Sequence, residues 1–383
     1  MEYYFSAEHL SVGYDGVPLI ENIEIGVKKG EILTLIGPNG SGKSTILKSM
    51  IRELRAIAGT VVLDRRSITE ISGRELAKKL AIVMTERIQA ELMSSWDVVA
   101  TGRYPYTGRL GILSAEDRRI VDQAIRMVHA EDYAEKPFLR ISDGQRQRLL
   151  LARAVCQEPE IVVLDEPTSF LDIRHKLELL EILKTMARER NMAIVMSLHE
   201  LDLAEKVSDR VAAVAEHRVD RVGTPEEVFR DDYIRELYGI KKGSYNALFG
   251  SPEMAAVQGN PQVFVIGGGG SGIPVYRMLQ RKGIPFSAGI LQENDLDFPT
   301  AKALSAELLS AGAYETPDRA LIEKAKDRIA RCGKAVCCVP VFREGNRANR
   351  ELYEYAEAQG FLREPGEIAG PEAGRNGTKG GAE

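Results

Sequence analysis

The sequence predicts an α/β protein that consists of two parallel-sheet units in one chain. Short apolar runs at residues 31–36 and 263–266 each end in a glycine-rich loop, and a helical pattern follows each loop. Strands that alternate with helices in this way form parallel sheets that are covered on both faces. The length of 383 residues also exceeds what one hydrophobic core needs. We therefore expect two α/β units, the first larger than the second.

The composition narrows the class of protein. Hydrophobic residues make up 44% of the chain and charged residues 28%, which is typical of globular proteins. The net charge of -5 argues against a protein that coats nucleic acid. No run approaches the roughly 20 apolar residues of a membrane helix, and the N-terminus lacks the pattern of a signal peptide. The four cysteines have no metal-ligand spacing and are too few for a disulfide framework, so we expect a reduced, cytosolic protein.

The first unit begins with a strand, a loop and a helix in immediate succession. The strand is predicted at residues 31–36, and residues 46–55 have helical periodicity. Continuous apolar runs of the kind found in buried parallel strands recur further along the chain. We expect strands at residues 161–164 and 193–198, with a helix between them at residues 172–189.

The loop after the first strand has the spacing of a phosphate-binding P-loop. Its glycines allow backbone N–H groups to turn inward around an anion, and the next helix directs its positive dipole end to the same place. Lys43 is expected to reach the β- and γ-phosphates, and the Ser44 hydroxyl to bind magnesium. The alternative is a chance glycine-rich turn, against which the flanking strand and helix argue. The predicted nucleotide-binding residues are Gly37, Pro38, Asn39, Gly40, Ser41, Gly42, Lys43, Ser44 and Thr45.

Two acidic residues follow the predicted strand at residues 161–164. Asp165 would stand at the carboxyl end of this strand, beside the magnesium ion. Glu166 comes next and is placed to orient or deprotonate an attacking water molecule. An apolar strand that ends in acidic turn residues is common, so this pattern indicates a nucleotide site only because the chain also has a P-loop. Together the two motifs predict hydrolysis of a nucleoside triphosphate.

Between these motifs the sequence reads Ile-Ser-Asp-Gly-Gln-Arg-Gln-Arg at residues 141–148. This segment resembles the signature motif of ATP-binding cassette (ABC) proteins. The order of P-loop, signature, acidic strand end and a lone His199 is similar to the layout of that family over residues 1–240. The resemblance implies a P-loop NTPase of the ABC ATPase type with a signature-bearing helical subdomain, and it implies ATP and Mg2+ as cofactors.

The resemblance also implies roles for single residues. Tyr14 matches the aromatic residue that stacks on adenine, although alone it could be a half-buried turn tyrosine. Glu166 matches the catalytic carboxylate, and His199 matches the switch residue at the γ-phosphate. Signature residues close over the nucleotide of the opposite subunit in this family, so the resemblance implies a homodimer. The matching residues are Ser142, Gly144 and Gln145 in the signature and Asp172 in the D-loop.

The sequence departs from the pattern of the family at two places. The signature has Asp143 where the commonest form has a second glycine, which adds a negative charge near the phosphate face. The glutamine of the Q-loop is replaced by Thr85 or Glu86. That glutamine helps to hold magnesium in this family and couples the site to the membrane partner.

The Gly-Arg-Tyr-Pro run at residues 102–105 resembles that of ATPases that energise importers of iron–siderophore complexes, haem and cobalamin. The resemblance implies an integral membrane permease that docks at residues 85–110, and indirectly an extracytoplasmic substrate-binding protein. We expect a peripheral protein on the cytoplasmic face of the cell membrane, with no nucleic acid partner. The alternative is a soluble ABC ATPase that acts on nucleic acid or ribosomes.

The second unit is expected at residues 263–365, after a linker at residues 241–262. Its loop, Gly267 to Gly272, has the spacing of a dinucleotide fingerprint and predicts a Rossmann-like domain. Either Glu293 or Asp295 stands about where a ribose-binding acid belongs. The sequence leaves a ligand-sensing domain with an unidentified ligand at this loop and a purely structural appendage both open.

The other elements of the second unit follow from periodicity. Apolar runs at residues 286–291 and 335–342 predict strands, and Cys337 and Cys338 in the latter are expected in the core rather than as reactive thiols. A disordered tail is expected at residues 366–383, which are rich in Gly and Glu. Helices are predicted from residue 273 and at residues 301–309, 317–330 and 347–359.

Overall fold

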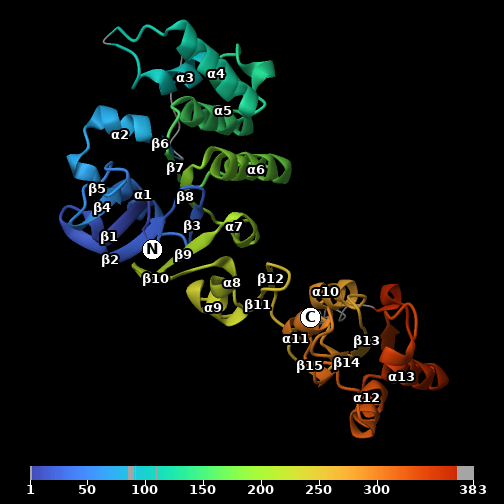
Figure 1. The fold of residues 1–383 in the computed structure, drawn as a ribbon. Coiled ribbons are helices and arrows are strands. Elements are labelled where there is room, and N and C mark those ends of the chain that lie inside the picture. The colour runs from blue at the N-terminus through green and yellow to red at the C-terminus, as the bar shows by residue number, and fades with distance from the viewer. Residues whose placement is uncertain (1, 85–89, 91, 109, 369–383) are drawn as a thin grey trace, which may run out of the picture. The chain divides into compact units, whose positions relative to one another are not determined.

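The computed structural model describes residues 2–84, 90, 92–108 and 110–368 of the chain. The chain forms two compact units, Met1–Gly239 and Ile240–Glu383 (Figure 1). Most of the expected tail, and both Thr85 and Glu86, lie outside the described residues. None of the helices described here is both long enough and apolar enough to cross a membrane.

The first unit is built around a six-stranded sheet with the strand order β10-β9-β3-β8-β7-β6. The strands from β9 to β6 run parallel, and β10 adds to the edge in the antiparallel direction. β3, β7 and β8 are buried along their whole length, which explains their continuous apolar sequences. The strands are β3 (Ile32–Ile36), β6 (Leu80–Val83), β7 (Ile161–Leu164), β8 (Ala193–Ser197), β9 (Arg210–Ala215) and β10 (Arg218–Gly223).

A second, antiparallel sheet covers the first, and the sequence reasoning did not predict it. Its order is β2-β1-β4-β5, with β1 (Phe5–Tyr14), β2 (Val17–Val27), β4 (Ala58–Leu63) and β5 (Arg66–Ser67). Its inward side chains form one core with helix α1 (Lys43–Met50) and with β3, β7 and β8. β1 ends at Tyr14 before a turn in which Asp15 and Gly16 both have positive φ.

A group of helices lies apart from the antiparallel sheet in the first unit (Figure 1). Helices α3 (Ser95–Ala100), α4 (Ala115–Met127) and α5 (Asp143–Cys156) pack against one another. Each begins at a serine that caps its first turn through a capping box. The remaining helices of the unit are α2 (Gly73–Lys79), α6 (Ile173–Arg190), α7 (Leu201–Val207), α8 (Pro225–Val228) and α9 (Asp231–Leu237).

The second unit contains a four-stranded parallel sheet with helices on both faces. Alternate residues of each strand point to opposite sides, so Val263 and Val265 contact the core under α10 and α11, whereas Phe264 and Ile266 contact the core under α12 and α13. The strand order is β15-β14-β13-β16. The elements are β13 (Val263–Ile266), α10 (Ile273–Arg281), β14 (Phe286–Gln292), α11 (Phe298–Leu304), β15 (Glu307–Ala311), α12 (Arg319–Cys332), β16 (Ala335–Cys337) and α13 (Arg347–Ala358).

Several elements differ from their predicted form. The helix predicted at residues 301–309 ends at Leu304, and β15 follows it as a strand at the edge of the sheet. β16 ends at Cys337, well before the end of the run predicted at residues 335–342. The range of the expected linker contains a hairpin, β11 (Ser244–Asn246) with β12 (Ser251–Glu253). Cys338 follows β16, and burial raises its pKa to about 12.

Candidate functional site

The P-loop joins β3 to α1 in a conformation that requires its glycines. Gly37 has φ of 145°, and a Cβ atom there would lie 2.0 Å from the carbonyl oxygen of Val214. Gly42 has φ of 101°, and its Cβ atom would lie 2.5 Å from the Ile20 side chain. The loop therefore packs closely between β2 and β9, and its backbone can form an anion nest only with glycine at these positions.

Lys43 lies buried beneath the loop at the start of α1. Its ammonium group donates hydrogen bonds to the carbonyl oxygens of Gly37, at 2.7 Å, and Pro38, at 3.0 Å. Burial lowers the pKa of Lys43, and the carboxylates of Glu166 and Asp165 act in the opposite direction. The strand–loop–helix arrangement thus holds a buried cation against the loop, which fits the binding of a phosphate group.

The carboxyl end of β7 brings Asp165 to the P-loop. The Ser44 hydroxyl donates to Asp165 Oδ1 over 3.1 Å, so two oxygen ligands of the kind that Mg2+ prefers lie side by side. Ser197, the last residue of β8, also donates to Asp165 Oδ1, over 2.6 Å, and accepts the Glu166 N–H over 2.9 Å. The sequence reasoning missed Ser197, whose only signal is a hydroxyl in an otherwise apolar strand.

Glu166 and His199 come from the ends of neighbouring strands and touch each other. His199 Nε2 lies 2.5 Å from Glu166 Oε1, and the Ser169 hydroxyl donates to Glu166 Oε2 over 3.1 Å. Glu166 has φ of 49°, in the left-handed region, so the chain turns sharply at the end of β7. The two residues predicted to be catalytic are therefore brought together with Asp165 at one edge of the sheet.

Tyr14 lies at the end of β1 and is 54% exposed. Its hydroxyl lies 3.3 Å from Thr45 Oγ1, and either group can donate. The contact fixes an exposed aromatic face beside the first turn of α1. This is a suitable position for stacking on the base of a nucleotide bound by the P-loop.

The signature residues Ser142, Gly144 and Gln145 lie at the start of α5. The Gln145 N–H donates to Ser142 Oγ over 3.3 Å, and the Ser142 N–H donates to Gln145 Oε1 over 3.0 Å. Arg146 donates to Asp143 Oδ1 over 2.6 Å, which offsets the negative charge that distinguishes this signature. No hydrogen bond among the described residues joins these three signature residues to the loop at residues 37–45.

Asp172 acts locally as a helix cap. It accepts the His175 N–H over 2.9 Å at the start of α6, and this backbone hydrogen bond is the main cause that lowers the pKa of Asp172. Gly144 lies close to the same turn, since its Cβ atom would lie 3.5 Å from Leu171 and 3.8 Å from the ring of His175. The D-loop and the signature of one chain are thus neighbours.

The Gly-Arg-Tyr-Pro segment at residues 102–105 has a buried part and an exposed part. Arg103 is buried, and it donates to Asp117 Oδ1 over 2.9 Å and to Glu158 Oε2 over 2.8 Å. A Cβ atom at Gly102 would lie 2.3 Å from the Arg153 carbonyl oxygen, so glycine is needed there. Exposed apolar side chains lie on the surface of the region predicted to dock a permease, namely Leu92, Tyr104 and Leu110, and Ile112 is exposed just beyond it.

Tyr238 contacts the P-loop from the last turn of the first unit, and sequence reasoning gave no signal for it. The Gly37 N–H donates to the Tyr238 hydroxyl over 3.0 Å. Burial raises the pKa of Tyr238 to about 12, so the hydroxyl stays neutral. The residue stands directly before Gly239, where the first unit ends.

In the second unit, the loop from Gly267 to Gly272 joins β13 to α10 as predicted. Of the two acidic candidates, Asp295 reaches the loop and accepts the Gly269 N–H over 2.9 Å, whereas Glu293 is exposed. A third acidic residue, Asp297, was missed. It is buried and accepts the N–H groups of Gly268 and Gly272.

Comparisons with known proteins show the family of the chain. The sequence matches the family described as ABC transporter over residues 20–169, and the MJ0874 family over residues 286–369. It is 43% identical to the uncharacterized ABC transporter ATP-binding protein MJ0873 of Methanocaldococcus jannaschii over 276 residues, which are 71% of this chain and 94% of that protein.

Other relatives carry names that describe import. The chain is 38% identical to the iron(3+)-hydroxamate import ATP-binding protein FhuC of Bacillus subtilis, over 61% of this chain and 87% of that protein. It is 30% identical to the cobalamin import ATP-binding protein BtuD of Halobacterium salinarum, over 80% of this chain and 78% of that protein. Among solved structures, cbiO1 of Clostridium perfringens, part of the ABC transporter complex cbiONQ, matches with a TM-score of 0.53 and 27% identity, over 62% of this chain and 94% of that one. The chain therefore belongs to the ATP-binding proteins of ABC transporters, and its first unit is an ABC ATPase domain.

Proposed function

We propose that this chain is the ATP-binding and ATP-hydrolysing subunit of an importer for an iron complex, such as a siderophore or haem, or for cobalamin. The relatives named for hydroxamate and cobalamin import support the substrate class. The observation that carries the ATPase mechanism is the convergence of Lys43, Asp165 and Glu166 at one edge of the sheet. The contacts of Lys43 with the loop and of Ser44 with Asp165 define that edge.

The residues at this edge have different roles in the transfer of the γ-phosphoryl group to water. Lys43 and the loop N–H groups hold the β- and γ-phosphates, and Ser44 with Asp165 would hold Mg2+, which would offset phosphate charge. Glu166 orients the attacking water and accepts a proton as the new bond from oxygen to the γ-phosphorus forms and the bond to ADP breaks. His199 holds the Glu166 carboxylate, to which it lies 2.5 Å away, in position.

The active form in this proposal is a homodimer. Ser142 is exposed at the start of α5, and Gly144 and Gln145 are partly buried there, in the helical group rather than at the P-loop of their own chain. In a dimer they would close over the γ-phosphate held by the partner chain. Asp172 caps α6 next to Gly144, so the D-loop would lie in the same interface.

The transport partner in this proposal is a separate integral membrane permease that docks at residues 85–110. The exposed side chains of Leu92, Tyr104 and Leu110 support an apolar contact there, and Arg103 would fix the segment from behind. An extracytoplasmic binding protein would deliver the substrate to the permease, and the chain would work at the cytoplasmic face of the membrane without nucleic acid.

A Glu166→Gln variant tests the ATPase mechanism. The amide keeps the shape of the side chain but cannot accept the proton of water, so the variant is expected to bind ATP and dimerise with kcat lowered about 100-fold or more. The matched control is Glu189→Gln, on the exposed surface of α6. Size-exclusion chromatography with ATP and a phosphate-release assay measure both properties. Hydrolysis at the wild-type rate by Glu166→Gln would contradict the role of Glu166.

A further inference from the structure

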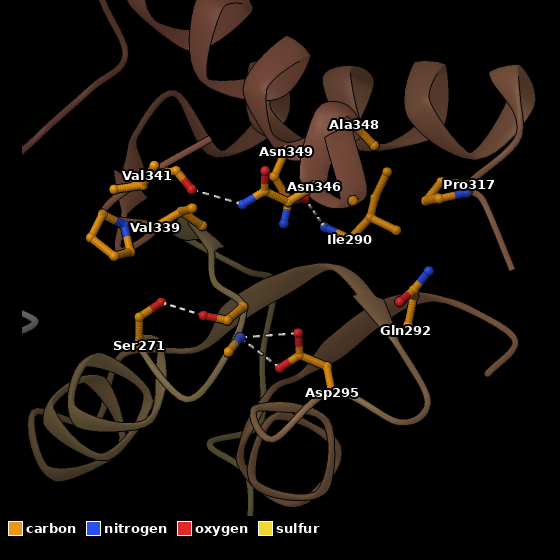
Figure 2. Close-up of a pocket in the computed structure, with 14 residues that line it drawn as sticks. Ser271, Ile290, Gln292, Asp295, Pro317, Val339, Val341, Asn346, Ala348 and Asn349 are labelled. Atoms are coloured by element: carbon orange, nitrogen blue, oxygen red, sulfur yellow. Dashed lines mark hydrogen bonds between the residues drawn. The ribbon is translucent and has the colours of Figure 1, made fainter. Parts of the chain in front are cut away.

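The second unit contains a cavity of about 320 Å³ at the carboxyl ends of its strands (Figure 2). The strand order β15-β14-β13-β16 makes the chain leave β13 toward one side and return to β16 on the other. Ligands of open α/β sheets bind outside such a reversal point, in the crevice at the carboxyl ends of the strands. Loops that follow all four strands line the cavity, through Gly269 after β13, Asp295 after β14, Pro317 after β15 and Val339 after β16. The topology therefore places this crevice where a mononucleotide-binding half binds its ligand.

A carboxylate of the protein already occupies the place where a phosphate group would bind in such a site. Asp297 accepts the N–H groups of Gly268 at 2.6 Å, Gly272 at 2.9 Å and Ile273 at 3.2 Å, at the N-terminus of α10. In a dinucleotide site these groups face the pyrophosphate. Asp297 is completely buried, so a phosphate group cannot reach the same donors unless this carboxylate leaves. The glycine loop is therefore not a pyrophosphate site.

The polar groups left for a ligand include strong acceptors. Of the described residues that line the cavity, Asp295 alone is charged, and its Oδ2 accepts only the Gly269 N–H, at 3.0 Å. A carboxylate oxygen can accept more than one hydrogen bond. Gln292 donates its amide N–H to the Glu315 carbonyl oxygen over 2.8 Å, which leaves its own oxygen available.

The opposite wall offers an apolar surface. Asn349 is held in place by the backbone, because it accepts the Ile290 N–H over 3.1 Å and donates to the Gly267 carbonyl oxygen over 2.9 Å. Figure 2 shows Ile290, Val339 and Val341 on this side of the cavity, across from Asp295. The crevice thus combines hydrogen-bond acceptors on one side with aliphatic side chains on the other.

We infer that this crevice binds a ribonucleoside without a phosphate group, with its vicinal diol on Asp295 and its base against the aliphatic wall. A diol can present two O–H donors to one carboxylate, and in dinucleotide-binding folds an acidic residue after the second strand accepts the ribose 2′-OH. The volume lies at the lower end of the range for small-molecule pockets, which suits a nucleoside and not a dinucleotide. A 5′-phosphate would bring negative charge toward Asp295 and Asp297, and none of the described residues that line the cavity is a cation that could offset it.

The test uses the full chain, with the P-loop site saturated by a non-hydrolysable ATP analogue and Mg2+. Isothermal titration with adenosine, guanosine, cytidine and uridine is expected to find at least one that binds. Its 2′-deoxy form and its 5′-monophosphate should bind about 10-fold more weakly or worse, since a hydrogen bond to a charged group is lost or like charges meet. Asp295→Asn should weaken binding of the ribonucleoside to a similar extent, and the matched control Glu293→Gln should not.

Each other result overturns the inference. It is wrong if no ribonucleoside binds, or if the 2′-deoxy form binds as tightly as the ribonucleoside. It is equally wrong if NAD or a monophosphate binds more tightly than the nucleoside, since the glycine loop would then accept phosphate. Because Asp295 also accepts backbone N–H groups, thermal unfolding of Asp295→Asn is measured first, and Gln292→Ala provides a second variant that leaves those contacts intact.

Discussion

Ser197 joins the two acidic residues of the ATPase site, and its replacement by alanine is the most informative single change. The hydroxyl is fully buried, donates to Asp165 Oδ1 over 2.6 Å and accepts the Glu166 N–H over 2.9 Å. Ser197→Ala removes both contacts and adds no new group. Asp165 keeps its hydrogen bond with Ser44 at 3.1 Å, so the carboxylate stays near the P-loop with one of its two side-chain hydrogen bonds.

The size of the effect follows from the two lost contacts. A hydrogen bond to a charged group contributes about 1.5–3 kcal/mol, and a buried N–H group left without an acceptor costs about 1–3 kcal/mol. The two terms overlap because the same hydroxyl makes both contacts, so we expect a loss of about 2–4 kcal/mol in the free energy of unfolding. If the transition state for hydrolysis also loses about 2 kcal/mol of stabilisation because the two carboxylates are less well positioned, kcat falls about 30-fold.

The assay compares Ser197→Ala with a control that removes a buried hydroxyl of a different kind. Ser49 in α1 is buried, and its hydroxyl has no hydrogen-bond partner among the described residues. Ser49→Ala should therefore leave both stability and kcat nearly unchanged. Thermal unfolding, ATP affinity and phosphate release are measured for both variants. The reasoning is refuted if Ser197→Ala behaves like Ser49→Ala in both stability and kcat.

Two further substitutions test contacts that hold the first unit together. Tyr238→Phe removes the acceptor of the Gly37 N–H. The loss of this hydrogen bond costs about 1 kcal/mol of binding free energy, so the Kd for ATP in an equilibrium titration should rise about 5-fold. An unchanged Kd would mean that this contact does not position the loop. Arg103→Met leaves Asp117 without its buried partner and should cost about 3 kcal/mol of stability, at the low end for a buried pair because Glu158 is half exposed. Arg119→Met, in an exposed pair with Glu116, is its control in denaturant unfolding, and equal losses in the two variants would contradict the anchoring role of Arg103.

The parts of the site that depend on local sequence were predictable. The P-loop needs glycines at fixed positions between a strand and a helix, and Asp165 and Glu166 need only the end of a buried strand. Parallel strands bring their carboxyl ends to one edge, so the meeting of Glu166 with His199 follows from the order of the motifs. These contacts required no knowledge of side-chain packing.

The residues that were missed all act across long separations in the chain. Tyr238 meets Gly37 and Ser197 meets Asp165 only because the sheet brings distant strands together, and neither residue belongs to a motif. Asp297 occupies the glycine loop of the second unit because α11 begins there, whereas spacing alone pointed to Glu293 or Asp295. Local periodicity could not show which acidic residue reaches the loop.

The sequence reasoning missed strand β15 for a related reason. Residues 301–309 have an apolar pattern that suits a helix, but the helix stops at Leu304, and residues from Glu307 pair with β14. A short apolar run is compatible with either state, and its pairing with a strand from elsewhere decides between them. The antiparallel sheet of the first unit depends on such pairing even more, since β1 contacts both β2 and β4.

The central claim is that this chain hydrolyses ATP to drive import through a separate permease. The most direct measurement is the ATPase rate of the full chain, alone and together with any polytopic permease encoded near its gene, in lipid vesicles. The account predicts that the permease co-purifies with the chain and stimulates hydrolysis, and that Glu166→Gln abolishes the stimulated rate. The account is contradicted if no permease binds and DNA or ribosomes stimulate the ATPase instead.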